Sequence, residues 1–264
     1  MVGRIVGFVE NLTPIALVGA GGIGKTTIAL TVLHHDRIKE RFGDNRRYIR
    51  CDRFTPSCSN FLRRLSQAIG ADIENPEHLT PLWPSLTSKE MLIVLDSAES
   101  MLDPQVTSGQ EINAVVEELS RFGNVCLCIT SRITAAPPDC EILEIPTLSM
   151  EAARDAFYQI YKYGRRSDSV DNILEQLDFH PLSVTLLASV AHQNEWDDDR
   201  LASEWELHKT GVLQMGSDKS LTGAIELSPA PSIFGELGSS VRAVLEVSAA
   251  FTSSIRIAYE HTPE

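Results

Sequence analysis

Residues 17–33 read LVGAGGIGKTTIALTVL, a glycine-rich turn between an apolar run and a helix-like segment. Within this stretch, Gly19 to Thr26 (GAGGIGKT) fits the pattern G-x-x-x-x-G-K-[ST] of a phosphate-binding loop. Glycines let backbone N–H groups approach phosphate oxygens without a Cβ clash. The N-terminus of the helix that follows favours the same anion. The stretch therefore predicts a site for a nucleoside polyphosphate at a strand-to-helix junction.

The residue types of this loop predict separate roles. We expect Lys25 to reach the β- and γ-phosphates and Thr26 to offer its hydroxyl to Mg²⁺. The residues expected to contact the nucleotide here are Gly19, Gly21, Gly22, Ile23, Gly24, Lys25, Thr26 and Thr27. The alternative is a glycine turn that only lets a strand and a helix pack. The strand before the pattern and the helix after it favour the phosphate loop.

Short apolar runs alternate with helix-like segments through the first 150 residues. The strand candidates lie at 15–18, 47–51, 91–96, 124–130 and 141–145, and helix-like segments lie near 25–40, 57–70 and 109–122. The apolar runs are nearly continuous, as in strands that are buried on both faces. The alternation predicts an α/β fold with a parallel sheet between layers of helices.

The pattern becomes purely helical after Pro146. A face of apolar residues begins after Ser149, which suits a helix cap, and Pro181 suits the first turn of a later helix. We therefore expect a nucleotide-binding domain over 1–148, a helical domain over 149–215 and a third segment over 216–264.

Composition limits the function classes. The 264-residue chain has a net charge of −13 and a pI near 5.0, which disfavours binding to nucleic acid or to an anionic membrane surface. No apolar run reaches the roughly 18 residues of a membrane span, and we expect a cytoplasmic protein. The five cysteines show no zinc or disulfide spacing, so we interpret them as buried, inert thiols.

An acidic residue follows the apolar run at 92–95. Asp96 stands where a strand ends, the edge at which open α/β sheets bind ligands, and we expect it to hold Mg²⁺. The alternative is a residue that only starts a loop. Hydrolysis needs a group that orients water, and Glu99 is the nearest candidate. An exposed acid at the start of a loop explains Glu99 equally well.

The run CLCIT leads into Ser131 and Arg132. A guanidinium at the same sheet edge could sense a γ-phosphate through charge-assisted hydrogen bonds. The alternative is an ordinary surface arginine.

The motif order GAGGIGKTT, LIVLDSAES, ITSR and FHPLSVTLLA resembles the nucleotide-binding core of STAND NTPases, in particular the NB-ARC and NACHT type of fungal and plant immune-receptor-like (NLR-like) proteins. The resemblance implies a five-stranded P-loop sheet, a helical bundle and the start of a winged-helix domain. It gives Arg132 the γ-phosphate-sensing role and places Pro181 against the adenine. The VGR at 2–4 is similar to the family's entry motif, which implies that Val2 and Arg4 line the base pocket.

This resemblance also implies a signalling switch that is closed with ADP and self-associates with ATP. ATP would be hydrolysed slowly to ADP and phosphate, with Lys25, Asp96, Glu99 and Arg132 as the catalytic set. Two alternatives stay open at this point. One is a stand-alone P-loop ATPase or kinase-like enzyme with fast turnover, and the other is an interaction module that has lost hydrolysis.

Overall fold

The computed structural model describes residues 1–214 apart from 72, 74, 75 and 135. Contacts divide the chain into two units. The first comprises Met1–Gly19 and Lys25–Ile145, and the second begins at Pro146 and also takes in Ala20–Gly24. The predicted third segment, 216–264, lies outside the described residues.

The described part of the first unit contains one parallel sheet of five strands in the order β2-β3-β4-β1-β5. The strands are β1 Ile15–Val18, β2 Arg46–Arg50, β3 Met91–Asp96, β4 Val125–Ser131 and β5 Glu141–Glu144. Each lies within one residue of its predicted position at both ends. The predicted α/β class with a five-stranded parallel sheet is confirmed.

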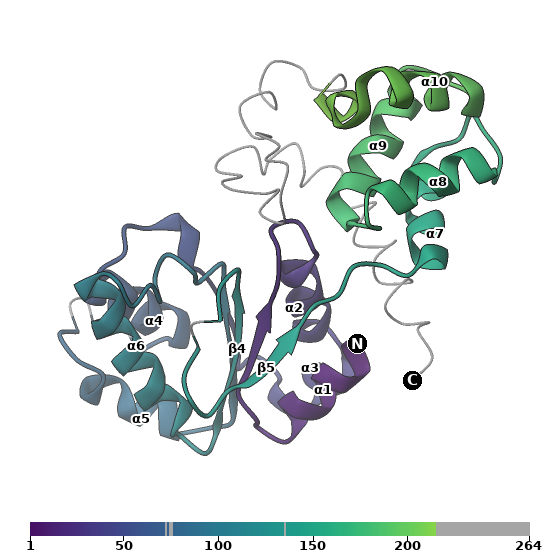
Figure 1. The fold of residues 1–264 in the computed structure, drawn as a ribbon. Helices are drawn as coiled ribbons and strands as arrows, with labels where there is room; N and C mark the ends of the chain where they lie inside the picture. The colour runs from purple at the N-terminus through teal and green to yellow at the C-terminus, as the bar shows by residue number, and fades with distance from the viewer. Residues whose placement is uncertain (72, 74–75, 135, 215–264) are drawn as a thin grey trace. The chain divides into compact units, whose positions relative to one another are not determined.

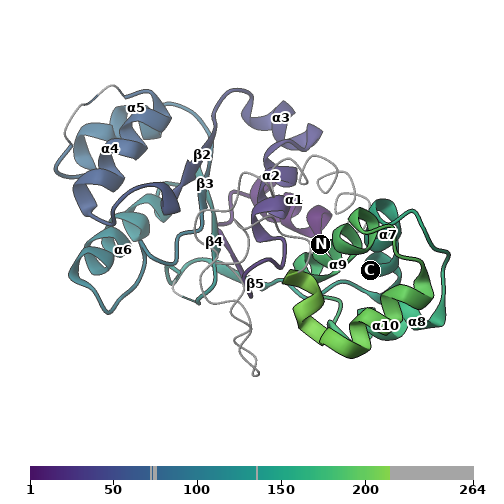
Figure 2. The ribbon, with the colours of Figure 1, turned by 90° about the horizontal axis from the view of Figure 1, so that it is seen from above.

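Helices cover both faces of this sheet (Figures 1 and 2). One face carries α1 Val2–Glu10, α2 Lys25–Leu33 and α3 Asp36–Phe42, and the other carries α4 Cys58–Ile69, α5 Trp83–Thr87 and α6 Thr107–Ser120. Short 3₁₀ turns lie at Cys51–Arg53 and Thr80–Leu82. Successive side chains along β3 and β4 point to opposite faces of the sheet. Ile93 and Leu127 point to the face covered by α4 and α6 and pack in the core there. Burial on both faces explains why these strands read as continuous apolar runs.

The cysteines are free thiols, and all except Cys58 are buried. Burial raises the pKa of Cys51 and of Cys126 to about 12, so these thiols stay protonated and unreactive near neutral pH. The interpretation of the cysteines as inert apolar side chains is confirmed for these buried positions.

The prediction of one helix over 25–40 is wrong. The segment forms two helices, because α2 ends at Leu33 and α3 begins at Asp36. Between them His35 has an extended backbone, and its ring nitrogen accepts the N–H of Arg37 at 3.3 Å. His35 therefore caps α3 rather than continuing α2. The helix α1 was not among the predicted elements; its apolar side buries Ile5 and Val9.

The described part of the second unit is helical. Its elements are α7 Met150–Ile160, α8 Asp168–Gln176, α9 Pro181–Gln193, α10 Asp198–His208 and a 3₁₀ segment, Lys209–Gln214. Two predicted helix starts are confirmed: Ser149 accepts the N–H of Ala152 at 3.2 Å, and Pro181 is the first residue of α9. Buried Phe157 and Tyr161 contribute to the core of this bundle.

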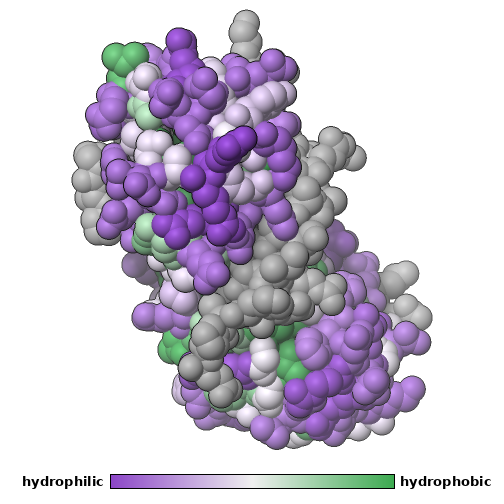
Figure 3. All heavy atoms as spheres, turned by 90° about the vertical axis from the view of Figure 1, so that its right-hand side faces the viewer, coloured by the Kyte–Doolittle hydropathy of each residue, from purple (hydrophilic) through white to green (hydrophobic). Residues whose placement is uncertain are grey.

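The surface agrees with the acidic, polar composition. On the face drawn in Figure 3, most of the described surface is hydrophilic, and the hydrophobic areas are small and separated. None of the described helices combines the length and the apolar character that crossing a membrane requires.

A pair of glycine substitutions tests the local stability of the first unit. Gly70 ends α4 with φ of 71° and ψ of 32°, a left-handed conformation in which a Cβ is strained. We expect Gly70→Ala to lower the free energy of unfolding by about 1 kcal/mol. Urea denaturation measures the change.

Gly7, inside α1, serves as the matched control because its backbone is helical and its Cβ position meets open space. Gly7→Ala should raise the free energy of unfolding by about 0.5–1 kcal/mol. A Gly70→Ala protein as stable as the parent would contradict the described end of α4.

Candidate nucleotide site

The candidate site lies at the carboxyl edge of the sheet. The register aligns Val18 of β1 with Ser131 of β4, and Arg50 of β2 with Asp96 of β3. The parallel strands therefore end together, and the segments that follow them meet at one edge. Since β4 lies between β1 and β3, it contributes side chains between the phosphate loop and Asp96.

The phosphate loop joins β1 directly to α2, as the sequence predicted. Gly22 and Gly24 have φ of 77° and 101°, values that favour glycine, so these two positions need it. Lys25 is the first residue of α2 and is 8% exposed. Its ammonium donates to the carbonyl of Gly19 at 2.7 Å. Burial lowers the pKa of Lys25 to about 8, while the nearby Glu99 carboxylate opposes this shift.

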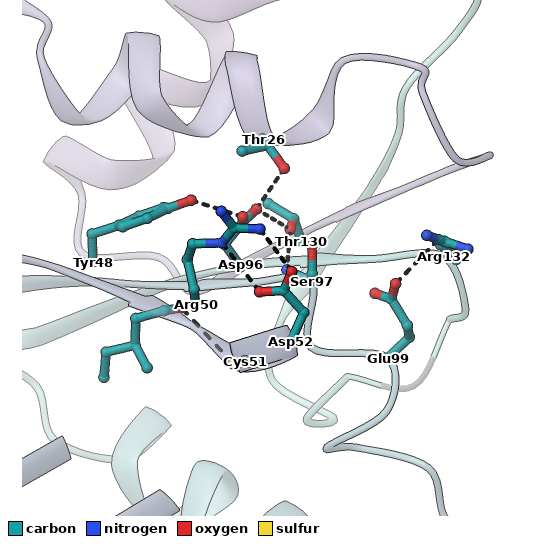
Figure 4. A network of polar contacts seen from close by, with 11 residues as sticks. Thr26, Tyr48, Arg50, Cys51, Asp52, Asp96, Ser97, Glu99, Thr130 and Arg132 are labelled. Carbon is teal, nitrogen blue, oxygen red and sulfur yellow. Dashed lines mark hydrogen bonds and ion pairs between the residues drawn. The ribbon is translucent and has the colours of Figure 1, made fainter. Parts of the chain in front are cut away.

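Three hydroxyl groups converge on the buried carboxylate of Asp96, which is 1% exposed (Figure 4). Thr26 and Thr130 both donate to Oδ1 at 2.7 Å, and Tyr48 donates to Oδ2 at 2.8 Å. These donors come from α2, β4 and β2. Burial and the Asp96 carboxylate raise the pKa of Tyr48, so its phenol remains a donor.

Thr130 also fixes the turn that follows Asp96. Its hydroxyl accepts the N–H of Ser97 at 2.8 Å, and its carbonyl accepts the N–H of Ala98 at 2.9 Å. Ser97 has φ of 55°, which is uncommon for a residue with a side chain. The Ser97 contact leaves the Thr130 proton directed at Asp96. Thr130 therefore orients both the carboxylate and the backbone beyond it.

Glu99 and Arg132 form an ion pair beside this cluster, with Arg132 Nε 3.1 Å from Glu99 Oε1 (Figure 4). Their side chains are 24% and 36% exposed, so both reach partly into solvent. The second oxygen, Glu99 Oε2, is buried and has no hydrogen-bond partner within the described residues. This oxygen can accept a hydrogen bond from a water molecule at this edge of the sheet.

The oxygen donors fit a magnesium–nucleotide complex. Magnesium in such sites takes one or two protein oxygens and completes its shell with phosphate oxygens and water. The hydroxyl proton of Thr26 is directed at Asp96, so its oxygen lone pairs stay available to a cation. Over the described ranges, no group of three or more His, Cys, Asp or Glu side chains could hold a metal ion.

The resemblance assigned three residues to the base pocket: Val2, Arg4 and Pro181. Val2 is buried at the start of α1, whereas Arg4 is exposed and its guanidinium lies 5.6 Å from the ring centre of Phe8. Pro181 is buried in the first turn of α9. Contact of these residues with a base stays a prediction.

Sequence reasoning missed Tyr48 and Thr130. Both residues lie inside predicted strands, but neither was predicted to be a site residue. A signal was present: each is a residue with a hydroxyl near the carboxyl end of a strand that borders β3. Cross-strand order, which identifies those neighbours, is not visible in the sequence.

The chain is similar in sequence to a known domain family and to a regulatory protein. Residues 1–103 match the model of the NB-ARC domain. The regulatory protein AfsR of Streptomyces griseus is 25% identical over 228 residues, which are 80% of this chain and 22% of AfsR. The chain thus spans about a fifth of the length of that relative.

Solved structures support the fold. The Walker-type ATPase PABY2304 of Pyrococcus abyssi has a TM-score of 0.55 at 15% identity, over 77% of this chain and 69% of that one. Cdc6p of Pyrobaculum aerophilum has a TM-score of 0.52 at 11% identity, over 74% of this chain and 62% of that one. The NB-ARC match over residues 1–103 agrees with the resemblance of the motif order to STAND P-loop NTPases, and the solved structures agree with this chain in fold.

Proposed function

We propose that the chain is an ATP- and ADP-binding signalling switch that binds its nucleotide with Mg²⁺ and hydrolyses ATP slowly. The observation that carries the proposal is the hydrogen bond from Thr26 to Asp96, 2.7 Å long. It joins the first turn after the phosphate loop to the end of β3. The Thr26 hydroxyl and the Asp96 carboxylate would be the two protein oxygen donors to a magnesium ion that is bound to the nucleotide phosphates.

The charge of the protein supports a local site for the anion. A net charge of −13 repels polyphosphates at long range, so binding depends on groups within the site. The loop supplies backbone N–H groups, α2 supplies its N-terminus, and Lys25 supplies a buried cation. Bound Mg²⁺ would neutralise further phosphate charge and hold the nucleotide against Thr26 and Asp96.

Glu99 and Arg132 are the proposed hydrolytic pair. The unpartnered Oε2 of Glu99 would orient the attacking water, and Arg132 would stabilise charge on the γ-phosphate. In the described state the two side chains form an ion pair, with Arg132 Nε 3.1 Å from Glu99 Oε1. The ion pair with Glu99 would compete with the γ-phosphate for Arg132, and this competition would slow hydrolysis.

The proposal includes nucleotide-dependent self-association and a cytoplasmic location. Its support is the NB-ARC match, since the STAND resemblance implies assembly in the ATP state. Roles as an NLR-like or NACHT-type receptor belong to the same proposal. The acidic surface favours protein partners over nucleic acid and anionic membranes.

Identification of the co-purifying nucleotide tests the proposal against its alternatives. The purified chain is denatured, and the released nucleotide is separated and quantified. Turnover is then measured with added ATP and Mg²⁺. Retained ADP with less than one turnover in minutes supports the switch. Fast multiple turnover would favour a stand-alone ATPase or a kinase-like enzyme, and binding without any hydrolysis would favour an interaction module.

Removal of the Lys25 ammonium should weaken binding of both ATP and ADP. A hydrogen bond to a charged group contributes about 1.5–3 kcal/mol, so Lys25→Ala should raise the Kd about 10- to 100-fold. Isothermal titration calorimetry measures the change. Lys39→Ala is the control, because Lys39 is exposed on α3 and pairs with Asp36 at 3.1 Å. Equal affinity in the Lys25 variant and the parent would refute the site.

Substitution of the proposed water-orienting carboxylate should separate hydrolysis from binding. Glu99→Gln keeps the shape of the side chain but removes the charge, and single-turnover phosphate release should fall about 10²- to 10⁴-fold. ATP affinity should change little. Glu90→Gln is the matched control, since Glu90 pairs with Arg41 at 2.9 Å in the same kind of surface ion pair. Unchanged phosphate release from the Glu99 variant would exclude it as the water-orienting group.

A further inference from the structure

Tyr48 reaches Asp96 from the neighbouring strand. The register of β2 and β3 aligns Tyr48 with Val94, and Asp96 lies two residues further along β3. Residues two apart on a strand share a face, so the carboxylate lies on the side of the sheet that Tyr48 faces. The phenol spans the diagonal and donates to Asp96 Oδ2 at 2.8 Å.

This contact holds the oxygen that the threonines leave open. Thr26 and Thr130 share Oδ1, so without Tyr48 rotation of the carboxylate about the Cβ–Cγ bond would be opposed at only one of its two oxygens. In Figure 4, Tyr48 approaches Asp96 from β2, while Thr26 approaches from the start of α2. Hydrogen bonds to both oxygens fix the orientation of the carboxylate plane.

The chemistry of the donors preserves the charge of Asp96. Within the described part of the chain, the three hydrogen bonds to its carboxylate come from neutral hydroxyls. The register aligns Arg50 with Asp96, yet its guanidinium pairs with Asp52 at 2.7 Å. An arginine on Asp96 would neutralise the charge that attracts a cation. Three hydroxyls orient the carboxylate and leave its negative charge for a metal ion.

We propose that Tyr48 is a positioning residue that holds the Asp96 carboxylate in the orientation required by the magnesium–nucleotide complex. The proposal rests on the proposed nucleotide function and adds a residue to it. Groups that hydrogen-bond a metal-binding carboxylate fix its orientation, and their loss weakens metal binding. Tyr48 acts on the metal only through Asp96.

Removal of the Tyr48 hydroxyl tests the proposal through the magnesium dependence of ATP binding. Calorimetry gives the Kd for ATP in EDTA and at a series of free Mg²⁺ concentrations, in the parent and in Tyr48→Phe. The Mg²⁺ concentration that half-saturates tight ATP binding should rise about tenfold in Tyr48→Phe. The ATP affinity in EDTA should stay within about twofold, since the phosphate loop is untouched.

A second tyrosine provides a matched control. Tyr161 donates to Asp198 at 2.8 Å, so Tyr161→Phe removes the same kind of bond from a carboxylate other than Asp96. Thermal unfolding without ligand measures the stability loss in both variants. A lower melting temperature in both, with a shifted Mg²⁺ midpoint only in Tyr48→Phe, supports the positioning role.

Two results overturn different claims. An unchanged Mg²⁺ midpoint in Tyr48→Phe, with normal Mg²⁺-dependent binding by the parent, overturns the role of Tyr48 alone. Absence of ATP and ADP binding by the folded parent overturns the nucleotide function and this inference with it. Should Tyr48→Phe unfold during purification, Tyr48→Trp keeps an aromatic side chain at this position, and its ring N–H lies at a different place on the ring from the tyrosine hydroxyl. A parent-like midpoint in that variant, whose donor cannot occupy the hydroxyl position, also counts against the proposal.

Discussion

The buried carboxylate of Asp96 connects four segments that are far apart in the chain. Hydroxyls of Thr26, Tyr48 and Thr130 bind its two oxygens, and each comes from a different element of the first unit. A carboxylate that is 1% exposed costs free energy unless its oxygens are hydrogen-bonded. The same contacts that satisfy this requirement set the geometry at the sheet edge. Stability of the core and preorganisation of the site therefore depend on one set of bonds.

The charge of the protein bears on the kinds of groups found at this sheet edge. A protein with a net charge of −13 gains little from its surface when it binds a polyphosphate. Lys25 is buried beside the loop, and the backbone N–H groups need no ionised partner. Since hydroxyls hold Asp96, its charge remains available to a magnesium ion. The Glu99–Arg132 pair keeps two further charges matched within 3.1 Å.

Local sequence patterns predicted the strands and the phosphate loop well. The strand candidates placed all five described strands within one residue. The signal is strongest for β1, β3 and β4, which are buried throughout and leave continuous apolar runs. The glycine pattern located the turn that Gly22 and Gly24 form with positive φ. The site residues beyond the loop depend on which strands are neighbours. Tyr48 and Thr130 were missed for this reason, since the order β2-β3-β4-β1-β5 arises from long-range pairing.

The errors in the helices have a local cause. The apolar spacing continues through His34 and His35, which made 25–40 read as one helix. The Arg37 N–H donates to the His35 ring and not to a backbone carbonyl of α2, so the first helix ends and α3 begins. The helix α1 also has an apolar face, with Ile5 and Val9 buried, that was not predicted as a helix. Side-chain capping by histidine is a weak signal in a sequence because serine, threonine and aspartate perform it more often.

The central position of β4 also links assembly of the chain to its ligand. Ile15 pairs with Cys128, and Met91 pairs with Val125, so β4 bridges strands that have no direct pairing with each other. Closing the long loop between β1 and β4 is entropically costly and makes such a topology slow to form. A nascent chain that ends before β4 lacks the bridge that brings Thr26 to Asp96. A ligand that requires both residues therefore binds only the completed sheet, and by mass action it draws the chain toward that state.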